Sequence, residues 1–499
     1  MRNGTRLAAL DLGSNSFRLE IGRYDQGQIH RTEYWKEMVR QGNGLDEDKN
    51  LSREAMQRGW DCLARFAERL AGFQRAHVRG VATQTLREAA NRDVFLERAR
   101  EILGFPIDVI SGPEEARLIY QGVVHLLPQS DERRLVIDIG GRSTELILGQ
   151  GYRSEQLASY RVGSVNWSMQ FFASGRLSAS AFHAAEVAAR AVLDEALLRF
   201  KPGTWDMAYG SSGTVGAVSD VLSAAGWPAG EITAEGLDWL RDRLVQAGSV
   251  DKIRGVGIKE ERRDVIGGGL SVLRALFSLF KLKSLSAAQG ALRQGVLFDL
   301  IDREDANTDA RSSTVERLAR RFAVDEEQAA RVTRTALTLY RQLIGPARGA
   351  EAERRLRKLG WAARLHEIGT AISHSSYHRH GAYILDHADA PGFAEPELHH
   401  MSQLVLGHRG KLRKLDVDLR DPETVQPLLC LRLAVILCHA RRAPDLRGMA
   451  LAPKARGLGY VLHTRAGWAQ AYPQSAHLLD EEAAQWRQAG AASFGVVEG

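Results

Sequence analysis

Two segments of the chain repeat one pattern of residues, LDLGSNSFRLEIG at 10–22 and IDIGGRSTELILG at 137–149. In each, an apolar run leads to an aspartate, Asp11 or Asp138, and a turn of small residues joins it to a second apolar run. A single copy is also what an ordinary β-hairpin with Asp in its turn would look like. Two copies matched position by position favour a functional pair.

The chemistry of this pattern points to phosphate. Gly and Ser in a tight turn let backbone N–H groups converge on an anion. A carboxylate at the same place would repel a bare phosphate, so Asp11 and Asp138 are expected to hold a divalent cation or a water molecule. A third Gly-Ser turn, YGSSGTVGAV at 209–218, follows a strand and opens a helix, an arrangement that also aims free N–H groups at an anion.

Length and composition limit the class of protein. The 499 residues exceed one hydrophobic core and predict three or four domains. A formal charge of +6 is a weak sign of an anionic partner, and no nucleic-acid-binding motif accompanies it, so nucleic acid is not expected as a substrate. We expect no membrane span and no signal peptide, and three cysteines without a CxxC pair predict no disulfide framework, so the cytoplasm is the expected location.

The pattern of elements divides the chain into four parts. Strands alternate with helices over 1–122, and the same α/β plan returns over 123–305. The texture then becomes almost purely helical over 306–450, and 451–499 form a small unit with two strands around a helix.

A pair of glutamates in SGPEEAR at 111–117 offers a base for activating water. Ser111 followed by Glu114 is the pattern of a capping box, which predicts that Glu114 is engaged with the helix backbone. Glu115 is then left free for chemistry. The alternative is that both carboxylates complement the helix dipole.

These segments resemble the Ppx/GppA family of exopolyphosphatases and guanosine pentaphosphate phosphohydrolases. The resemblance rests, in family order, on DLGSNSFRL, TQTLREA, SGPEEARLIYQGV, DIGGRSTEL, GSSGT and LHEIG with HSSYHRHGAYIL. It implies an α/β fold with two ribonuclease-H-like domains of the actin, Hsp70 and sugar-kinase superfamily, then an all-α HD-like domain and a small α+β C-terminal domain. It further implies Mg²⁺-dependent hydrolysis and a homodimer, and a monovalent cation such as K⁺ is a second cofactor candidate.

The resemblance also assigns roles to residues. Glu115 matches the family's catalytic glutamate and Arg87 its active-site arginine, while Asp11, Asp138 and Glu145 are the expected metal contacts. The residues expected to bind substrate are Gly13, Ser14, Asn15, Ser16, Gly140, Gly141, Arg142, Ser143, Gly210, Ser211, Ser212 and Gly213. Arg18, Lys411, Arg413 and Lys414 are weaker candidates for steering a polyanion.

Two positions depart from the family pattern. Arg142 stands where a third glycine is usual; since Asn15 occupies the matching place in the first copy, a side chain is acceptable there, and an arginine there is able to contact phosphate. In the helical part, His366 is followed by Glu367 rather than Asp, and no histidine lies between His183 and His366. We therefore expect a degenerate HD domain without its metal centre.

The sequence favours an exopolyphosphatase acting on inorganic polyphosphate, with guanosine pentaphosphate as the alternative substrate. Polyphosphate is preferred because a long polyanion gains affinity from basic groups far from the cleft, whereas no base pocket is recognisable. An ATP-dependent kinase or ATPase and a non-catalytic polyphosphate sensor are the rivals from other classes.

Overall fold

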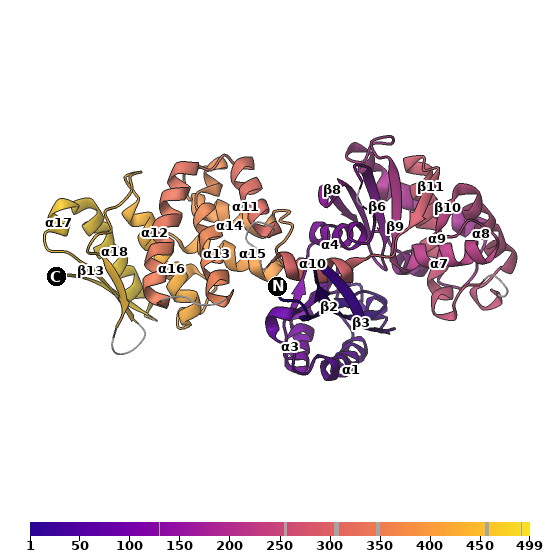
Figure 1. Cartoon of the computed structure of the whole chain (residues 1–499), viewed down its shortest axis with the longest axis horizontal. Coiled ribbons are helices and arrows are strands. Elements are labelled where there is room, and N and C mark those ends of the chain that lie inside the picture. The colour runs from indigo at the N-terminus through magenta and orange to yellow at the C-terminus, as the bar shows by residue number, and fades with distance from the viewer. Residues whose placement is uncertain (129, 254–256, 304–308, 346–349, 455–458, 491) are drawn as a thin grey trace. The chain divides into compact units, whose positions relative to one another are not determined.

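The computed structural model describes residues 1–128, 130–253, 257–303, 309–345, 350–454, 459–490 and 492–499. These form two compact units, Met1–Asp309 and Ala310–Gly499 (Figure 1). The expected boundary between 305 and 306 lies outside the described residues, and the division into four domains stays a prediction.

The first unit contains two sheets of related topology. The described strands of the first sheet run in the order β3 (Gln28–Glu37), β2 (Phe17–Asp25), β1 (Arg6–Leu12), β4 (Val78–Ala82) and β5 (Ile107–Val109). Those of the second run in the order β8 (Arg153–Tyr160), β7 (Thr144–Gln150), β6 (Arg133–Ile139), β9 (Met207–Ser211), β11 (Ser284–Ala287) and β10 (Glu231–Thr233).

The five described strands of the first sheet have counterparts in the second, which adds β10 at its edge. In each, the strand that ends at the repeated motif pairs antiparallel with the strand after it, β1 with β2 and β6 with β7. Each also pairs parallel with a later strand, β4 or β9. The sequence repeat is thus the centre of a duplicated sheet, and the expected α/β plan of both halves is confirmed.

The helices of the first unit lie in three layers around the two sheets. They are α1 (Arg53–Leu70), α2 (Gln84–Glu88), α3 (Arg92–Leu103), α4 (Gly112–Val124), α5 (Ser164–Phe171), α6 (Ala179–Leu193), α7 (Ser212–Ala224), α8 (Ala234–Ala247), α9 (Glu260–Phe280) and α10 (Leu292–Asp302). Short 3₁₀ turns lie at Gln41–Gly44, Arg75–His77, Asp194–Leu198 and Val250–Lys252. Helices α4 and α10 lie between the two sheets (Figure 1).

Alternation along the strands decides which layer each side chain enters. In β1, Leu10 belongs to the outer core with α1 and α3, whereas Leu7 and Ala9 belong to the shared core with α4 and α10. In β6, Ile137 faces the other outer core and Val136 faces the shared one.

A buried ion cluster joins the shared helices to the first sheet. Asp299 of α10 accepts hydrogen bonds from Arg79 of β4, Arg117 of α4 and Arg303, and its side chain is 2% exposed. Glu114 is fully buried and binds Arg117 at 2.7 and 2.9 Å. These contacts hold the pKa of Asp299 below its ordinary value, although burial alone would raise it.

The second unit is helical with a small sheet against it. Its helices are α11 (Ala310–Arg321), α12 (Glu326–Ile344), α13 (Ala350–Arg364), α14 (Tyr377–His387), α15 (Glu395–Gly407), α16 (Pro422–Leu437), α17 (Trp468–Ala471) and α18 (Pro473–Ala489), with 3₁₀ turns at Ile368–Ala371 and Leu412–Lys414. Strands β12 (Ala450–Pro453), β13 (Gly459–Thr464) and β14 (Ser493–Glu498) form the sheet. One hydrophobic cluster spans both parts, and a buried pair, Arg432 with Glu482, ties α16 to α18.

Three histidine rings pack together inside the second unit. His408 lies 5.5 Å from His366 and 6.2 Å from His378 between ring centroids. Burial lowers the pKa of His366 and of His408, and it lowers the pKa of His378 to about 4. The rings are therefore held neutral, and the loss of the HD metal centre stays a prediction.

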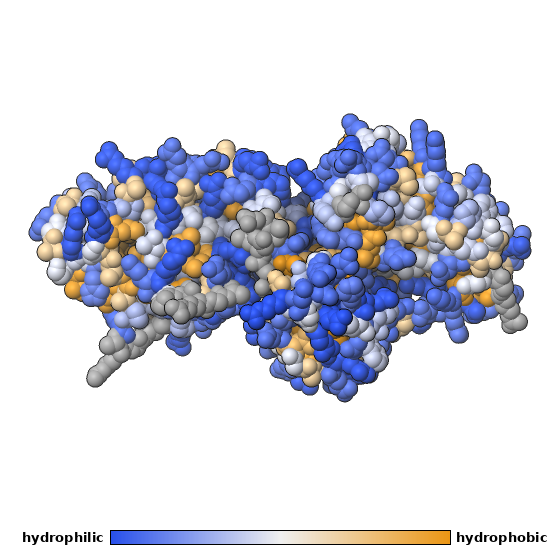
Figure 2. All heavy atoms as spheres, viewed as in Figure 1, coloured by the Kyte–Doolittle hydropathy of each residue, from blue (hydrophilic) through white to orange (hydrophobic). Residues whose placement is uncertain are grey.

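On the face shown in Figure 2, hydrophobic residues are scattered among hydrophilic ones. In the described part of the chain, every helix is too short or too polar to cross a bilayer.

The ion cluster gives a first prediction. Asp299→Asn should lower the free energy of unfolding by about 3–5 kcal/mol, because it leaves buried arginines without their counter-charge. Urea unfolding of the full chain measures this, and Glu68→Gln, an exposed change on α1, should stay within about 0.5 kcal/mol of the wild type. A loss below about 1 kcal/mol would show that Asp299 contributes little.

The neutral histidines give a second prediction. A histidine whose pKa is lowered by folding must take up a proton on unfolding, so its stabilisation is present above its ordinary pKa of 6.5 and is lost as pH falls below it. Each buried histidine contributes up to about 1.4 kcal/mol per pH unit.

The measurement compares slopes. Unfolding free energy of the wild type should fall more steeply from about pH 7.5 to 5.5 than that of the His366→Gln, His408→Gln double variant. Because carboxylates elsewhere titrate equally in both proteins, the difference isolates the two rings. Parallel slopes would contradict the assignment.

Candidate functional site

A polar pocket opens in the first unit where the repeated turns face each other. The predicted residues that line it are Asp11, Gly13, Ser14, Asn15, Ser16, Arg18, Glu115, Asp138, Gly140, Gly141, Arg142, Ser143, Ser212 and Gly213. Four predicted residues stand outside this lining, namely Arg87, Glu145, Gly210 and Ser211. The structure thus brings together residues from three separate turns and from α4.

Strand alternation explains why the charged groups converge. Asp11 lies two residues after Ala9, and Asp138 lies two residues after Val136. Because alternate side chains of a strand share a face, both carboxylates lie on the faces that enclose α4 and α10. Glu115 reaches the same space from the first turn of α4. All three carboxylates are buried, with exposed fractions of 7% or 8%.

Both repeated turns leave backbone amides for an anion. The carbonyls of Ser14 and Asn15 accept from Gly42 and Arg40, and those of Gly140 and Gly141 accept from Ser164 and Val165. In these two turns, the backbone amides of residues 14, 15, 141 and 142 donate to no described protein group. A Cβ on Gly141 would lie 3.1 Å from that of Ser14, so the two turns touch. This is the expected arrangement for holding phosphate oxygens.

The third turn contributes the N-terminus of α7. Ser212 has a φ of +93°, and its hydroxyl accepts from the amides of Thr214 and Val215. Gly213 has no room for a side chain because the Arg262 guanidinium lies against it. Gly210 abuts Val215 and Leu285. The Ser211 hydroxyl donates to the Gly290 carbonyl at 3.0 Å and lies within hydrogen-bonding reach of Asp138, so it adjoins the site from outside the pocket lining; the substrate contact of both residues stays a prediction.

The repeated hairpins differ in the residue opposite the aspartate. Arg18 pairs with Asp11 in the first copy, and Glu145 pairs with Asp138 in the second. Arg18 and Arg293 of α10 therefore lie near Asp11, at 4.0 and 3.4 Å. The second copy has two carboxyl groups side by side, Asp138 and Glu145, and Arg18 and Arg293 act on Asp138 from across the pocket.

Burial dominates the pKa values of these carboxyl groups, and neighbouring charges modify them. Burial raises the pKa of Asp138 to about 6 and, aided by Glu115 and Asp138, raises that of Glu145 well above its ordinary value. Burial also raises the pKa of Glu115 to about 7; Arg87 acts against this, while Asp11 and Asp138 add to it. Glu115 thus has the proton affinity of a general base near neutral pH.

The two glutamates of α4 have different environments. Ser111 caps the helix as predicted, accepting from the Glu114 amide at 3.2 Å. The Glu114 side chain, however, binds Arg117 and Arg79 in the buried ion cluster, so the predicted capping box is wrong in its second half. Glu115 instead faces the pocket.

Arg87 holds Glu115 from behind. Both terminal nitrogens of its guanidinium lie 3.3 Å from the Glu115 Oε2. The same group also donates to the Ile110 carbonyl and the Gln84 side chain. Arg87 therefore orients the glutamate, and its contact with phosphate stays a prediction.

Two arginines of the site, Arg262 and Arg293, were not predicted from the sequence. Arg262 of α9 lines the pocket, and burial together with the neighbouring Arg18 lowers its pKa. The Nε of Arg18 is buried without a partner among the described residues. Arg293 supports Asp11. Neither arginine sits in a recognisable motif, and KEERRD at 259–264 looks like a solvated charge run.

The carboxylates suit a loosely held Mg²⁺. In the part of the chain that the structure describes, no three His, Cys, Asp or Glu side chains form a closed metal site. Mg²⁺ commonly takes one or two carboxylates plus waters and substrate phosphates, and Asp11 with Asp138 offers such a pair. Glu145 accepts from Ser159 at 2.7 Å and adds charge behind Asp138.

The arrangement suits hydrolysis of a phosphoanhydride. Amides and arginines neutralise the charge of the transferred group, and a buried carboxylate is placed to take a proton from water. The pocket contains no nucleophilic cysteine among its lining residues.

Relatives with known names match nearly the whole chain. A guanosine-5'-triphosphate,3'-diphosphate pyrophosphatase of Vibrio campbellii is 39% identical over 477 residues, which is 95% of each chain. The protein of the same name from Vibrio vulnificus is 39% identical over 483 residues, 96% of each chain.

Solved structures match a part of the chain. A crystal structure of an exopolyphosphatase-like protein shares 25% identity with a TM-score of 0.55, covering 60% of this chain and 98% of the other. The Aquifex aeolicus PPX-GPPA enzyme shares 25% identity with a TM-score of 0.50, covering 59% and 98%. The predicted superfamily fold is confirmed for this part; the HD-like assignment stays a prediction.

Two family descriptions account for most of the sequence. The Ppx/GppA phosphatase family matches residues 21–304, and Ppx/GppA phosphatase domain III matches residues 310–483. Together with the whole-length relatives, these matches show that the chain belongs to the Ppx/GppA phosphatase family.

Proposed function

We propose that this protein hydrolyses the terminal phosphoanhydride bond of guanosine 5'-triphosphate 3'-diphosphate. The observation that carries the proposal is the 39% identity, over 95% of the chain, to a relative named for this pyrophosphatase activity. The pocket supplies the chemistry: three anion-binding turns face a buried glutamate. The sequence alone favoured polyphosphate, and the comparisons favour its alternative.

In the proposed mechanism, Glu115 orients a water molecule and accepts its proton. The water oxygen forms a bond to the terminal phosphorus, and the bond to the bridging oxygen breaks, so the rest of the nucleotide leaves as an anion. Arg87 fixes the Glu115 carboxylate by two contacts of 3.3 Å. Amides of the turns at 13–16 and 140–143 stabilise charge on the phosphoryl oxygens.

Asp11 and Asp138 would hold Mg²⁺ in this site. When bound, the ion supplies positive charge to the phosphate oxygens. Burial and the neighbouring Glu115 and Asp138 raise the pKa of Glu145, so a cation bound beside these carboxylates would relieve their mutual repulsion. Arg18 and Arg262 face the same space and complement the anionic substrate.

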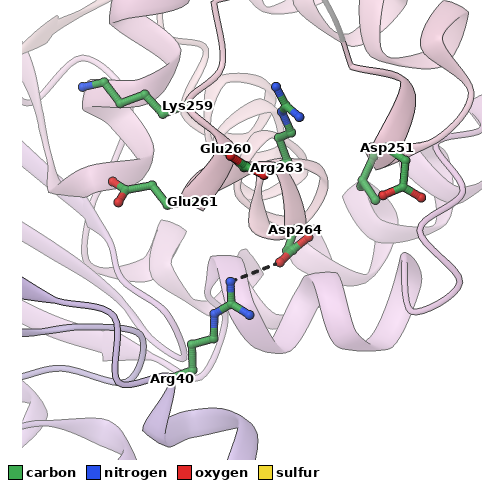
Figure 3. Close-up of a pocket in the computed structure, with 8 residues that line it drawn as sticks. Arg40, Asp251, Lys259, Glu260, Glu261, Arg263 and Asp264 are labelled. Atoms are coloured by element: carbon green, nitrogen blue, oxygen red, sulfur yellow. Dashed lines mark ion pairs between the residues drawn. The ribbon is translucent and has the colours of Figure 1, made fainter.

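A hollow beside the phosphate pocket offers room for the nucleoside. It shares Asn15 with the pocket and combines apolar Val165 and Phe172 with the polar side chains of Asn43 and Asp264. It continues into a second, charged hollow, in which Arg40 and Asp264 point toward each other at 3.5 Å (Figure 3). An apolar wall with amide and carboxylate edges suits a nucleobase and ribose better than a polyphosphate chain.

The basic groups expected to guide polyphosphate lie in the second unit. Lys411, Arg413 and Lys414 are exposed around the 3₁₀ turn Leu412–Lys414. Because these basic groups are available to a long polyanion, polyphosphate is the competing substrate.

Replacing each glutamate of the α4 pair should separate catalysis from folding. Glu115→Gln should lower kcat by roughly a hundredfold or more with the Tm kept, because it removes only the base. Glu114→Gln should instead lower the Tm and keep more of the activity of the folded fraction, because Glu114 lies in the ion cluster. Phosphate release and thermal unfolding of both variants measure this. Full turnover by folded Glu115→Gln would refute the assigned base.

The substrate is tested by parallel kinetics. Phosphate release from guanosine pentaphosphate should show a higher kcat/KM than release from long-chain polyphosphate at equal salt, because only the nucleotide fills the hollow beside Asn15. Met169→Glu, at the exposed rim of that hollow, should weaken the nucleotide reaction more than the polyphosphate reaction. A clear preference for polyphosphate would reverse the substrate assignment and leave the catalytic residues in place.

A further inference from the structure

We propose that Glu88 is a positioning residue that links the second phosphate-binding turn to the catalytic base. The inference rests on the proposed function, since it concerns the same site. It starts from Arg142, whose backbone belongs to the turn at 140–143 and whose guanidinium crosses to the first sheet's side of the pocket.

Arg142 is held by two groups across the cleft. Its Nη1 donates to the Gly42 carbonyl at 3.1 Å, and its Nη2 lies 3.5 Å from the Glu88 Oε2. Arg161, from the segment after β8, approaches the other oxygen of Glu88 at 3.5 Å. The Glu88 side chain is only 12% exposed, so it needs these positive charges.

Glu88 is connected to the catalytic base Glu115 through other residues of its own helix. The Gln84 side-chain amide donates to the Glu88 Oε1 at 2.6 Å, and the Gln84 oxygen accepts from Arg87. Arg87 in turn contacts Glu115. The series Arg142, Glu88, Gln84, Arg87 and Glu115 is therefore continuous, and three of its five members lie on the short helix α2.

The two halves of the pocket meet within this series. Arg142 is placed by the second sheet, and α2 adjoins β4 of the first. Helix α4, which carries Glu115, lies in the layer between the sheets and contacts β7 and β8 of the second. A Cβ on Gly42 would lie 3.3 Å from the Arg142 side chain and 3.2 Å from that of Ser14, so the halves are in contact at this point. Arg87 is held beside Glu115 by Gln84 and the Ile110 carbonyl, and the contact of Glu88 with Arg142 ties this arrangement to the second turn.

An alternative role for Arg142 is a direct contact to phosphate. That role predicts a change in KM when Glu88 is altered, because the guanidinium would be released toward the substrate. The positioning role predicts a change in kcat, because substrate contacts persist while the base loses its orientation.

The test uses the full chain and begins with the wild type on guanosine pentaphosphate and on polyphosphate. The better substrate is then used for Glu88→Gln, which keeps shape and removes charge. We expect kcat to fall about tenfold or more, with KM within about twofold and an unchanged Tm. Glu97→Gln, an exposed change on α3, should match the wild type.

A second variant and a double variant make the test specific. Gln84→Met breaks the middle of the series without altering charge, and it should reproduce the fall in kcat. Because Glu88 acts through Arg87, Glu88→Gln combined with Arg87→Ala should be no slower than Arg87→Ala alone.

The outcomes separate the two proposals. Wild-type kcat in either Glu88→Gln or Gln84→Met, a change confined to KM, or a double variant slower than Arg87→Ala would each overturn the role of Glu88. Failure of the proposed substrate shows instead in the wild type, as a preference for polyphosphate, and leaves the Glu88 test valid. A wild type that releases phosphate from neither substrate overturns both.

Discussion

The close contact of α4 with α10 is the constraint on which the first unit depends. A Cβ on Gly122 would overlap the Ala291 carbonyl, and one on Gly295 would overlap the Leu118 carbonyl, so the helix backbones touch. The two helices form a thin layer between the sheets, and both sheets pack against it as a common core. Because the layer is thin, carboxylates from β1 and β6 and the base from α4 reach one small space. The ion cluster around Asp299 then fixes the register of the helices within the layer.

The site is built on two repeated hairpins that share a backbone arrangement and differ in their side chains. The hairpins retain the same aspartate, the same glycine and the same turn, and the glycines Gly13 and Gly140 approach the Ser16 and Ser143 carbonyls alike. Opposite the aspartate, however, one copy carries Arg18 and the other Glu145. One copy thereby places a positive charge beside its aspartate, while the other places a second carboxyl group beside its own.

Much of this could be predicted from sequence because the decisive signals were local. Repeated turns and apolar strands revealed the central strands of both sheets, and β13, β14 and α18 were also expected. Strand β3 was missed because its exposed residues do not alternate with buried ones, as at Arg31, Thr32, Tyr34 and Trp35. Arg262 and Arg293 were missed because long-range packing decides them. The partner of Glu114 is Arg117, only three residues along α4, and this spacing was present in the sequence; the remote part of the cluster is Asp299, which meets Arg117 from α10.

The strand alternation described above also limits how this site can change in evolution. Asp11 faces the shared layer only by parity with Leu7 and Ala9, so inserting or deleting one residue in β1 would turn it toward the outer core with α1 and α3. The same holds for Asp138 in β6. Insertions within these strands are therefore closed as a route to new specificity. Variation must come through side-chain replacement at fixed positions, as at Arg142, or through segments that enter the pocket from outside the hairpins, as α9 does with Arg262.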